Sequence, residues 1–209
     1  MAATRTHRSD AGVGSRDLLL EATIEAIEAG GEEAVHLRDI GAAAGVTTPT
    51  IYHFFGSRAG LIIEAQAARF KESLLTFTPA AGEQLERCQS IDEVEATLRS
   101  LAAPILSSDR SKFRFTRLEA LGSAVSRPLL QERLSNALRE SNEQFAAILT
   151  RLQARGLVRT DISALTIAAY VTSVIFSRVI IEMDTSSNNE AEWDSLALDG
   201  VLAAILPPR

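Results

Sequence analysis

The chain has 209 residues, of which 46% are apolar and 23% are charged, and its formal net charge is −6. This composition is that of an ordinary folded protein, and the single cysteine excludes a disulfide scaffold. An acidic excess is unfavourable for binding nucleic acid, because neutralising phosphates requires lysine and arginine. Any DNA-binding role therefore has to rest on a local arrangement of residues rather than on the net charge.

Residues 1–14 are polar and contain glycine, so we expect a flexible arm. They lack the apolar run of a secretory signal, and with the single thiol this predicts a cytoplasmic location. Behind the arm, apolar stripes of helical period predict an all-α chain with no alternating strand pattern. We expect about nine helices, near residues 15–29, 37–44, 48–54, 58–76, 91–106, 111–124, 128–155, 161–183 and 190–206. Pro79 and Gly82 are expected to mark a break, and either Asp161 or Ser163 to cap the penultimate helix.

The most informative segment, residues 36–55, predicts two short helices joined by a tight turn. Gly45 lies where the first helix should stop, which suits a left-handed backbone conformation. Thr47 is a good N-cap for the second helix, and Pro49 falls in its first turn, where a missing N–H is tolerated. The pattern is that of a helix-turn-helix.

The second of these helices has an inner and an outer face. Ile51 and Phe55 lie four residues apart and are expected to face inward with Ile40. This leaves four polar side chains exposed near the start of a helix of the kind that meets base edges and phosphates, namely Thr48, Thr50, Tyr52 and His53. For His53, contact with DNA and simple exposure to solvent are both open.

The sequence closely resembles the TetR family of repressors over about 50 residues. The matching segments are RDLLLEAT (16–23), the glycine pair 30–31, IGAAAGVT (40–47), TIYxFF (50–55) and GSRAGL (56–61). The resemblance implies that Arg38, Thr48, Thr50 and Tyr52 contact DNA and that Arg58 holds a phosphate. The candidate DNA-binding set is Arg38, Thr47, Thr48, Pro49, Thr50, Tyr52, His53 and Arg58.

The chain departs from the family pattern at a few positions. His36 stands where a threonine often caps a helix, and Phe54 replaces a frequent histidine. Arg58 replaces a common lysine, which keeps the charge but not its geometry. We assign no DNA contact to Phe54, since it has no polar group.

The expected domains are the arm, a three-helix helix-turn-helix domain at 15–73 and a helical effector-binding and dimerisation domain at 74–209. The helices within 161–206 are too apolar for one subunit to cover, which predicts a homodimer that Ile175→Asp or Val179→Asp should dissociate. A membrane span is the weaker reading of the first of them, because Arg178 interrupts its uncharged stretch. A two-fold dimer presents two identical recognition helices, so we expect it to bind palindromic operator DNA.

An apolar effector pocket is expected in the C-terminal domain, with Phe70, Phe77, Phe113, Phe145 and Tyr170 as candidate ligand contacts; each is alternatively plain core. Arg117 and Arg178 are expected in surface ion pairs, although polar roles in a pocket are open. No nucleophile–base pair, metal cluster or phosphate loop stands out, so we expect no catalytic residues, metal or cofactor, and no enzyme. The leading hypothesis is a repressor released by a small, mostly apolar effector; the alternative is a constitutive DNA-binding or interaction protein.

Overall fold

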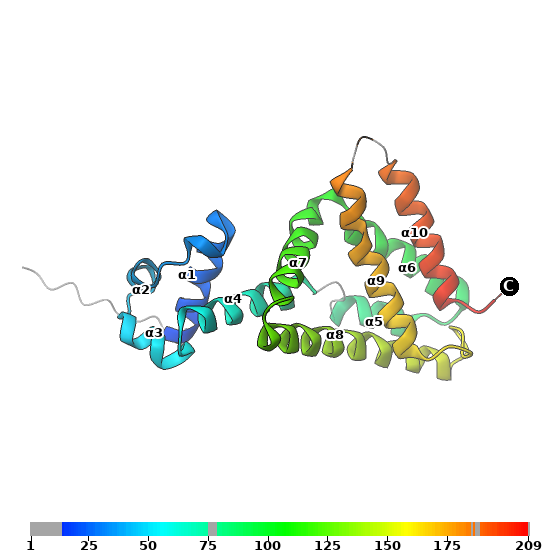
Figure 1. Cartoon of the computed structure of the whole chain (residues 1–209). Helices are drawn as coiled ribbons and strands as arrows, with labels where there is room; N and C mark the ends of the chain where they lie inside the picture. Colours follow the sequence, from blue (N-terminus) through cyan, green and yellow to red (C-terminus); the bar gives the residue numbers. More distant parts are fainter. Residues whose placement is uncertain (1–13, 75–78, 185, 187–188, 209) are drawn as a thin grey trace, which may run out of the picture. The chain divides into compact units, whose positions relative to one another are not determined.

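The computed structural model describes residues 14–74, 79–184, 186 and 189–208, and every regular element in these ranges is a helix (Figure 1). The predicted all-α class is therefore confirmed; the predicted arm lies outside the described residues except for Gly14. The α-helices are α1 (Ser15–Gly30), α2 (Leu37–Ala44), α3 (Thr48–Phe55), α4 (Arg58–Ser73), α5 (Pro79–Arg87), α6 (Ile91–Leu106), α7 (Ser111–Ala124), α8 (Pro128–Ala154), α9 (Ala164–Met183) and α10 (Glu190–Ile205). Two 3₁₀ helices, η1 (Glu32–Ala34) and η2 (Ser108–Arg110), complete the described elements.

The helix that the sequence did not predict is α5. Pro79 was expected only to mark a break, but it begins this helix, since a first turn does not need the N–H that proline lacks. Gly82 lies inside α5, where a Cβ atom would be 2.9 Å from the Cδ1 atom of Ile148 on α8. Close packing of α5 against α8 therefore accounts for a glycine that looks like a helix breaker.

The chain divides into two compact units, one ending at Ala68 and the other beginning at Arg69. In the first unit, one apolar core joins α1, Val35 after η1, α2, α3 and the first turns of α4. Its buried members are Leu19, Ile27, Val35, Ile40, Ile51, Phe55, Leu61, Ile62 and Ala65. The last turn of α4 belongs to the second unit, so this helix contributes residues to both.

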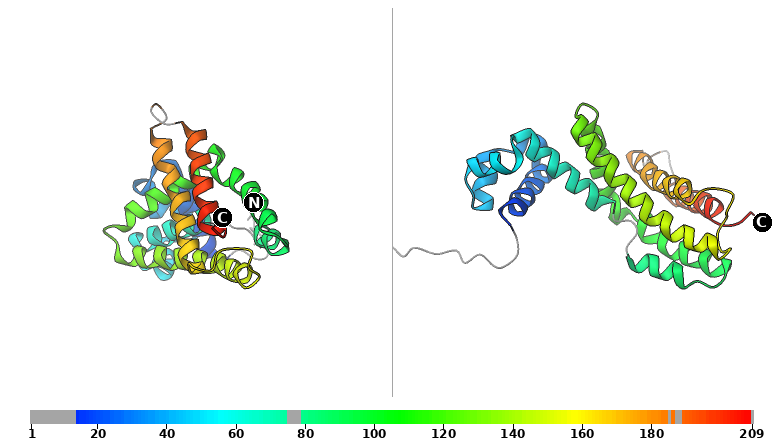
Figure 2. Two further views of the ribbon diagram at one scale, coloured as in Figure 1. Left: turned by 90° about the vertical axis from the view of Figure 1, so that its right-hand side faces the viewer. Right: turned by 90° about the horizontal axis from the view of Figure 1, so that it is seen from below.

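The second unit has a core of its own, built mainly by α5, α6, α8, α9 and α10. Phe145 and Leu149 of α8, Ile167 and Val171 of α9 and Ile205 of α10 are among its buried members. Helices α9 and α10 run side by side (Figures 1 and 2). The cap of α9 is Ser163 rather than Asp161, since the Ser163 hydroxyl accepts the N–H of Thr166 at 3.2 Å.

Among the described helices, α9 is the one long and apolar enough to cross a membrane by length and composition. It carries Arg178, which is 1% exposed and pairs with Asp194 of α10 at 2.6 Å. An arginine buried against a neighbouring helix is a feature of a helix packed inside a folded domain. We therefore interpret α9 as a core helix.

The expectation that Arg117 and Arg178 form surface ion pairs is wrong, because both side chains are buried. Arg178 and the equally buried Arg114 belong to one ionic cluster that joins α7, α9 and α10. Its carboxylates are Glu182, which pairs with both arginines, and Glu190 and Asp194, which pair with Arg178. Burial lowers the pKa of Arg178, but the hydrogen bonds that Arg178 donates to Glu190 and Asp194 outweigh burial and raise it.

Candidate functional site

The turn between α2 and α3 is built as the sequence predicts. Gly45 has φ 67° and ψ 27°, the left-handed conformation in which a side chain is strained. A Cβ atom on Gly41 would lie 2.9 Å from the carbonyl oxygen of Val46, so the turn also packs closely against α2. The glycines thus fix the angle at which α3 leaves α2.

We expect Gly45→Ala to lower the free energy of unfolding by about 1–2 kcal/mol, because alanine is strained in the left-handed region. Urea unfolding of the full chain, followed by circular dichroism, measures the loss. The matched control is Gly122→Ala in α7, where no atom lies within 4 Å of an added Cβ and alanine should stabilise the helix. Equal effects of the two substitutions would contradict the assigned turn.

Thr47 occupies the N-cap position of α3, but its side chain accepts no hydrogen bond from the helix backbone. Its hydroxyl instead lies 3.0 Å from the hydroxyl of Thr50. The expected capping role of Thr47 is therefore wrong. The two hydroxyls form a pair at the start of α3.

The inner face of α3 is as predicted, whereas the outer face is as predicted only at Tyr52 and His53. Ile51 is fully buried and Phe55 is 9% exposed, whereas the Tyr52 side chain is 51% exposed. His53 and Pro49 are also exposed, while Thr48 and Thr50 are half-buried. The helix is thus held by its inner face and presents a tyrosine and a histidine outward.

The two arginines of the candidate set differ in what they contact. The Arg38 side chain is 94% exposed and has Asp39 as a neighbour at 3.6 Å. Arg58 donates from Nε to the carbonyl oxygen of Val35 at 2.7 Å and from Nη2 to that of Glu32. Arg58 therefore ties the start of α4 to the turn before α2, a positioning role that sequence reasoning missed.

The charge near α3 differs from the charge of the whole chain. No acidic residue occurs between Asp39 and Glu64, so the turn and all of α3 carry no negative side chain. Among the described residues of the N-terminal unit, the acidic side chains lie on α1, on η1, at Asp39 next to Arg38 and at Glu64 on α4. The net charge of −6 therefore does not oppose an anionic partner at α3 itself.

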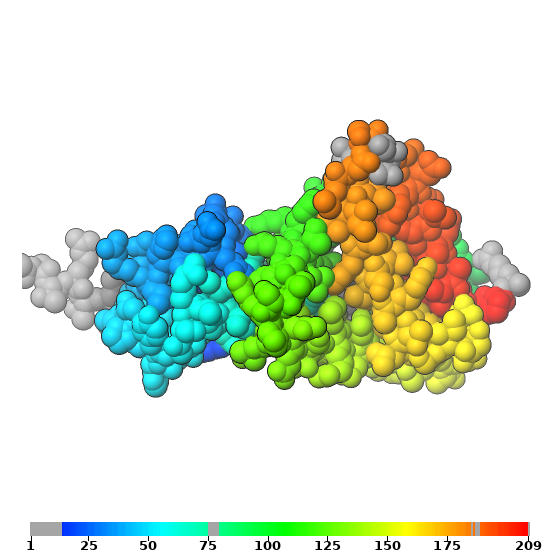
Figure 3. Space-filling model, in the orientation of Figure 1, coloured from blue at the N-terminus to red at the C-terminus, as the bar shows by residue number. Residues whose placement is uncertain are grey.

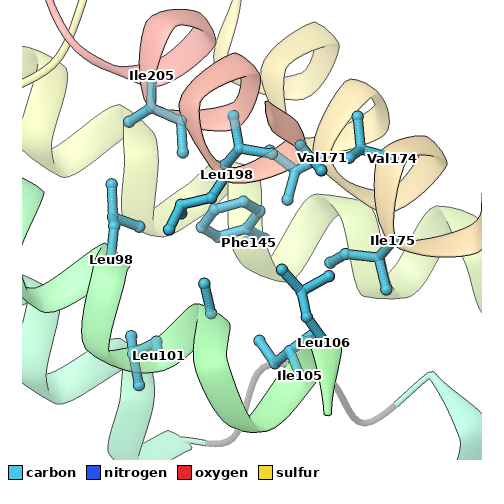
Figure 4. A pocket seen from close by; sticks show the side chains of 13 residues that line it. Leu98, Leu101, Ile105, Leu106, Phe145, Val171, Val174, Ile175, Leu198 and Ile205 are labelled. Atoms are coloured by element: carbon cyan, nitrogen blue, oxygen red, sulfur yellow. The ribbon is translucent and has the colours of Figure 1, made fainter. Parts of the chain in front are cut away.

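A small apolar cavity of about 50 Å³ lies in the second unit between α6, α8, α9 and α10. Figure 4 shows side chains of these helices gathered around Phe145, among them Leu98, Val171, Ile175 and Leu198. A second cavity of about 30 Å³ shares Phe145, Val171 and Ile175 with the first, so the two cavities border on the same side chains. Drug-sized ligands need roughly 300 Å³ or more, so a ligand would have to widen this space.

The five predicted ligand contacts are not brought together. Phe145 lines both cavities. Phe70 is buried edge-on against Phe176, with ring centroids 6.3 Å apart, and Phe113 lies under the guanidinium of Arg110. Tyr170 is 45% exposed on α9, and Phe77 lies outside the described residues. The aliphatic residues of α6 and α10 that line the cavity were missed, because their periodicity is that of any core helix.

Two short helices with a glycine turn, the second exposing polar side chains, define a helix-turn-helix DNA-binding domain, here joined to a helical C-terminal unit. Residues 19–65 match the model of a family described as bacterial regulatory proteins, tetR family. The N-terminal unit of the chain is thus similar to the DNA-binding domain of the TetR family of bacterial regulators.

Solved structures show the same fold over about nine-tenths of the chain. A protein described as a TetR-family transcriptional regulator from Rhodococcus sp. is 18% identical with a TM-score of 0.65, covering 91% of this chain and 98% of its own. A TetR-family regulator from Mesorhizobium loti is 16% identical with a TM-score of 0.66, and the match covers 92% of this chain and 97% of that one. A transcriptional regulator from Saccharomonospora viridis in complex with choline is 17% identical with a TM-score of 0.63, and the match covers 93% of this chain and 98% of that one. No curated protein matches the chain.

Proposed function

We propose that this chain is a cytoplasmic repressor that binds palindromic operator DNA as a homodimer and is released by a small, mostly apolar effector. The observation that carries the DNA-binding part is the outer face of α3. It presents Tyr52 and His53 on a helix that has no acidic residue, beside the exposed Arg38. A helix of this kind fits the major groove, where such side chains reach base edges and phosphates.

We expect Tyr52→Ala and Arg38→Ala each to weaken operator binding by about 1–3 kcal/mol, because each removes one contact of the recognition surface. The operator is first selected from random DNA with the unchanged protein, and titrations of the labelled site then give the affinities. A two-fold dimer predicts that the selected site is a palindrome.

The control for charge is Arg87→Ala on α5, since the Arg87 side chain is also largely exposed, at 78%. This variant should bind the operator as the unchanged protein does. If Tyr52→Ala and Arg38→Ala also bind it unchanged, α3 is not the recognition helix.

The proposed dimer surface lies on α9 and α10. Large apolar side chains stand exposed there, namely Leu165, Tyr170, Ile180 and Met183 of α9 and Leu196 of α10. The two helices form one continuous surface in the space-filling view (Figure 3). Apolar side chains gathered on a surface mark an interaction site, and a two-fold pairing of two helices per subunit makes a four-helix bundle.

The substitutions expected from the sequence to dissociate the dimer are not suited to that purpose. Val179 is 7% exposed within a single chain, and Ile175 lines the apolar cavity. Both side chains face the core of their own subunit, so aspartate there would unfold the domain. Ile180, which is 64% exposed on the same helix, is the residue that tests the dimer.

The effector response is supported by the apolar cavity and by the continuity of α4. This helix begins at Arg58, beside the helix-turn-helix, and its last residues belong to the C-terminal unit. A ligand that shifts those residues would change how the paired recognition helices are presented, and a preference of about 1–3 kcal/mol weakens DNA binding roughly 5–150-fold. The choline complex of the Saccharomonospora viridis regulator supports small-molecule binding by this fold.

Screening small molecules for release of the selected operator tests the response. Because coupling is reciprocal, the operator must weaken ligand binding by the factor by which the ligand weakens operator binding. If no ligand shows such coupling, the constitutive alternative replaces the effector-responsive one. Regulators of this family are generally not enzymes, and among the described residues no group of metal-ligating side chains occurs.

A further inference from the structure

Arg117 differs from the other buried arginines of the C-terminal unit. Arg69, Arg114 and Arg178 each form an ion pair with a carboxylate, contributed by Glu119, Glu182 and Asp194 respectively. Arg117 is 3% exposed, and within the described part of the chain no carboxylate lies at ion-pair distance from it. Buried charges in folded proteins are normally paired, so this one needs an explanation.

The hydrogen bonds of Arg117 satisfy only part of its guanidinium. Nε donates to the carbonyl oxygen of Ser73 at 3.1 Å, and Nη2 donates to the same oxygen. Nη1 is buried and has no hydrogen-bond partner among the described residues. Burial first, and then the nearby charges of Arg110 and Arg114, lower the pKa of Arg117 to about 10. Among the described residues, the guanidinium of Arg117 thus has no paired counter-charge.

Arg117 lies directly behind the wall of the smaller cavity. Its guanidinium carbon is 4.9 Å from the centroid of the Phe176 ring, and Phe176 lines that cavity. Leu74, which follows Ser73, lines it as well. The hydroxyl-bearing residues Ser141 and Thr172 are the polar part of its lining, and beyond Phe145 the larger cavity is apolar. Phe176 therefore contacts both the guanidinium and the cavity, and a ligand in the cavity would meet Arg117 only if this side chain rotated.

We propose that the effector is a monocarboxylate with an apolar body, whose carboxylate pairs with Arg117 and whose body occupies the two joined cavities. This inference rests on the proposed effector response. The carboxylate supplies the missing charge and accepts the N–H of Nη1, while Phe145, Val171 and Ile175 move apart to admit the body. A neutral ligand of the same shape can accept the hydrogen bond but supplies no counter-charge, and a cationic one is repelled by the guanidinium.

The same contact would reach α4. Arg117 holds the carbonyl of Ser73, the last residue of α4, where a cation is favoured by the helix dipole. A carboxylate that takes up part of the guanidinium charge weakens this hold on the end of the helix. Binding at Arg117 is thereby coupled to the element that the proposed release mechanism requires.

The test measures binding of straight-chain carboxylates, from butanoate to dodecanoate, and of the alcohols of equal chain length to the full chain by calorimetry. The best carboxylate should bind about ten- to a hundred-fold more tightly than its alcohol, as expected for hydrogen bonding to a charged group. In Arg117→Met this preference should fall to about one, whereas Arg139→Met, at an exposed arginine of α8, should keep it.

Alcohols that bind as tightly as the carboxylates, or a series in which no carboxylate binds, would overturn the inference. The comparison within the unchanged protein needs no variant, so a poorly folded Arg117→Met does not impair it. Operator release is measured separately. If a neutral ligand releases the operator, the proposed effector response stands and the carboxylate inference fails. If a carboxylate binds at Arg117 without releasing the operator, the binding site stands and the proposed effector response fails.

Discussion

Replacing Glu182 with glutamine is expected to destabilise the C-terminal unit by about 3 kcal/mol, because it removes one partner of a buried ion pair. Glu182 is 7% exposed and pairs with Arg114 and Arg178, which are both 2% exposed by side chain. Glutamine keeps the shape and one hydrogen bond but leaves the Arg114 charge without a counter-charge. Urea unfolding followed by circular dichroism measures the loss.

The matched control is Glu83→Gln on α5. Glu83 makes the same kind of carboxylate–arginine contact with Arg87, at 3.2 Å, but the two side chains are 66% and 78% exposed. Exposed pairs contribute less than about 1 kcal/mol, so this variant should unfold almost as the unchanged protein does. If the two substitutions have equal effects, the Glu182 cluster is open to water in solution.

Ile180→Asp is expected to convert the proposed dimer to monomers at micromolar concentration. Two copies of a charged group would enter an apolar interface, and an unpaired buried charge costs several kcal/mol, so the dissociation constant should rise at least about a hundredfold. Sedimentation velocity over a concentration series measures it. Because Ile180 is 64% exposed in a single chain, the monomer should stay folded.

Two further variants make this result specific. Ile91→Asp applies the same change to an isoleucine that is 38% exposed at the start of α6, and it should remain dimeric. Val179→Asp should lose helical signal instead of dissociating cleanly, because Val179 is buried within its own subunit. A dimer that persists in Ile180→Asp would place the interface elsewhere.

The helix-turn-helix was predictable because its signals are local. Gly45 ends α2, Pro49 suits the first turn of α3, and the spacing of Ile51 and Phe55 assigns the inner face. The role of Arg58 was not predictable, because the carbonyl groups that it contacts lie 23 and 26 residues earlier in the chain. Family resemblance implied a phosphate contact there, and that contact remains a proposal.

The C-terminal unit was predictable as a set of helices but not as a site. The ends of α6, α7 and α9 follow the sequence signals, yet the burial of Arg114 depends on Glu182, which lies 68 residues away. A charged residue in a helix reads as exposed unless its partner is known. The cavity was not predictable either, because its aliphatic residues have the periodicity of any core helix. Aromatic side chains were predicted to line it, whereas aliphatic residues of α6, α9 and α10 form most of its lining.

The backbone is closely packed at the junction of α3 and α4. A Cβ atom on Gly60 would lie 2.1 Å from the carbonyl oxygen of Phe55, and the N–H of Gly60 is bonded to the Ser57 hydroxyl at 2.9 Å. Together with the bonds of Arg58 to the preceding turn, these contacts join the two helices at their ends. We expect the amides at the end of α3 and the start of α4 to exchange with deuterium as one cooperative unit, slowly and at one common opening free energy. If the start of α4 moves, the end of the recognition helix α3 should then move with it as a rigid body.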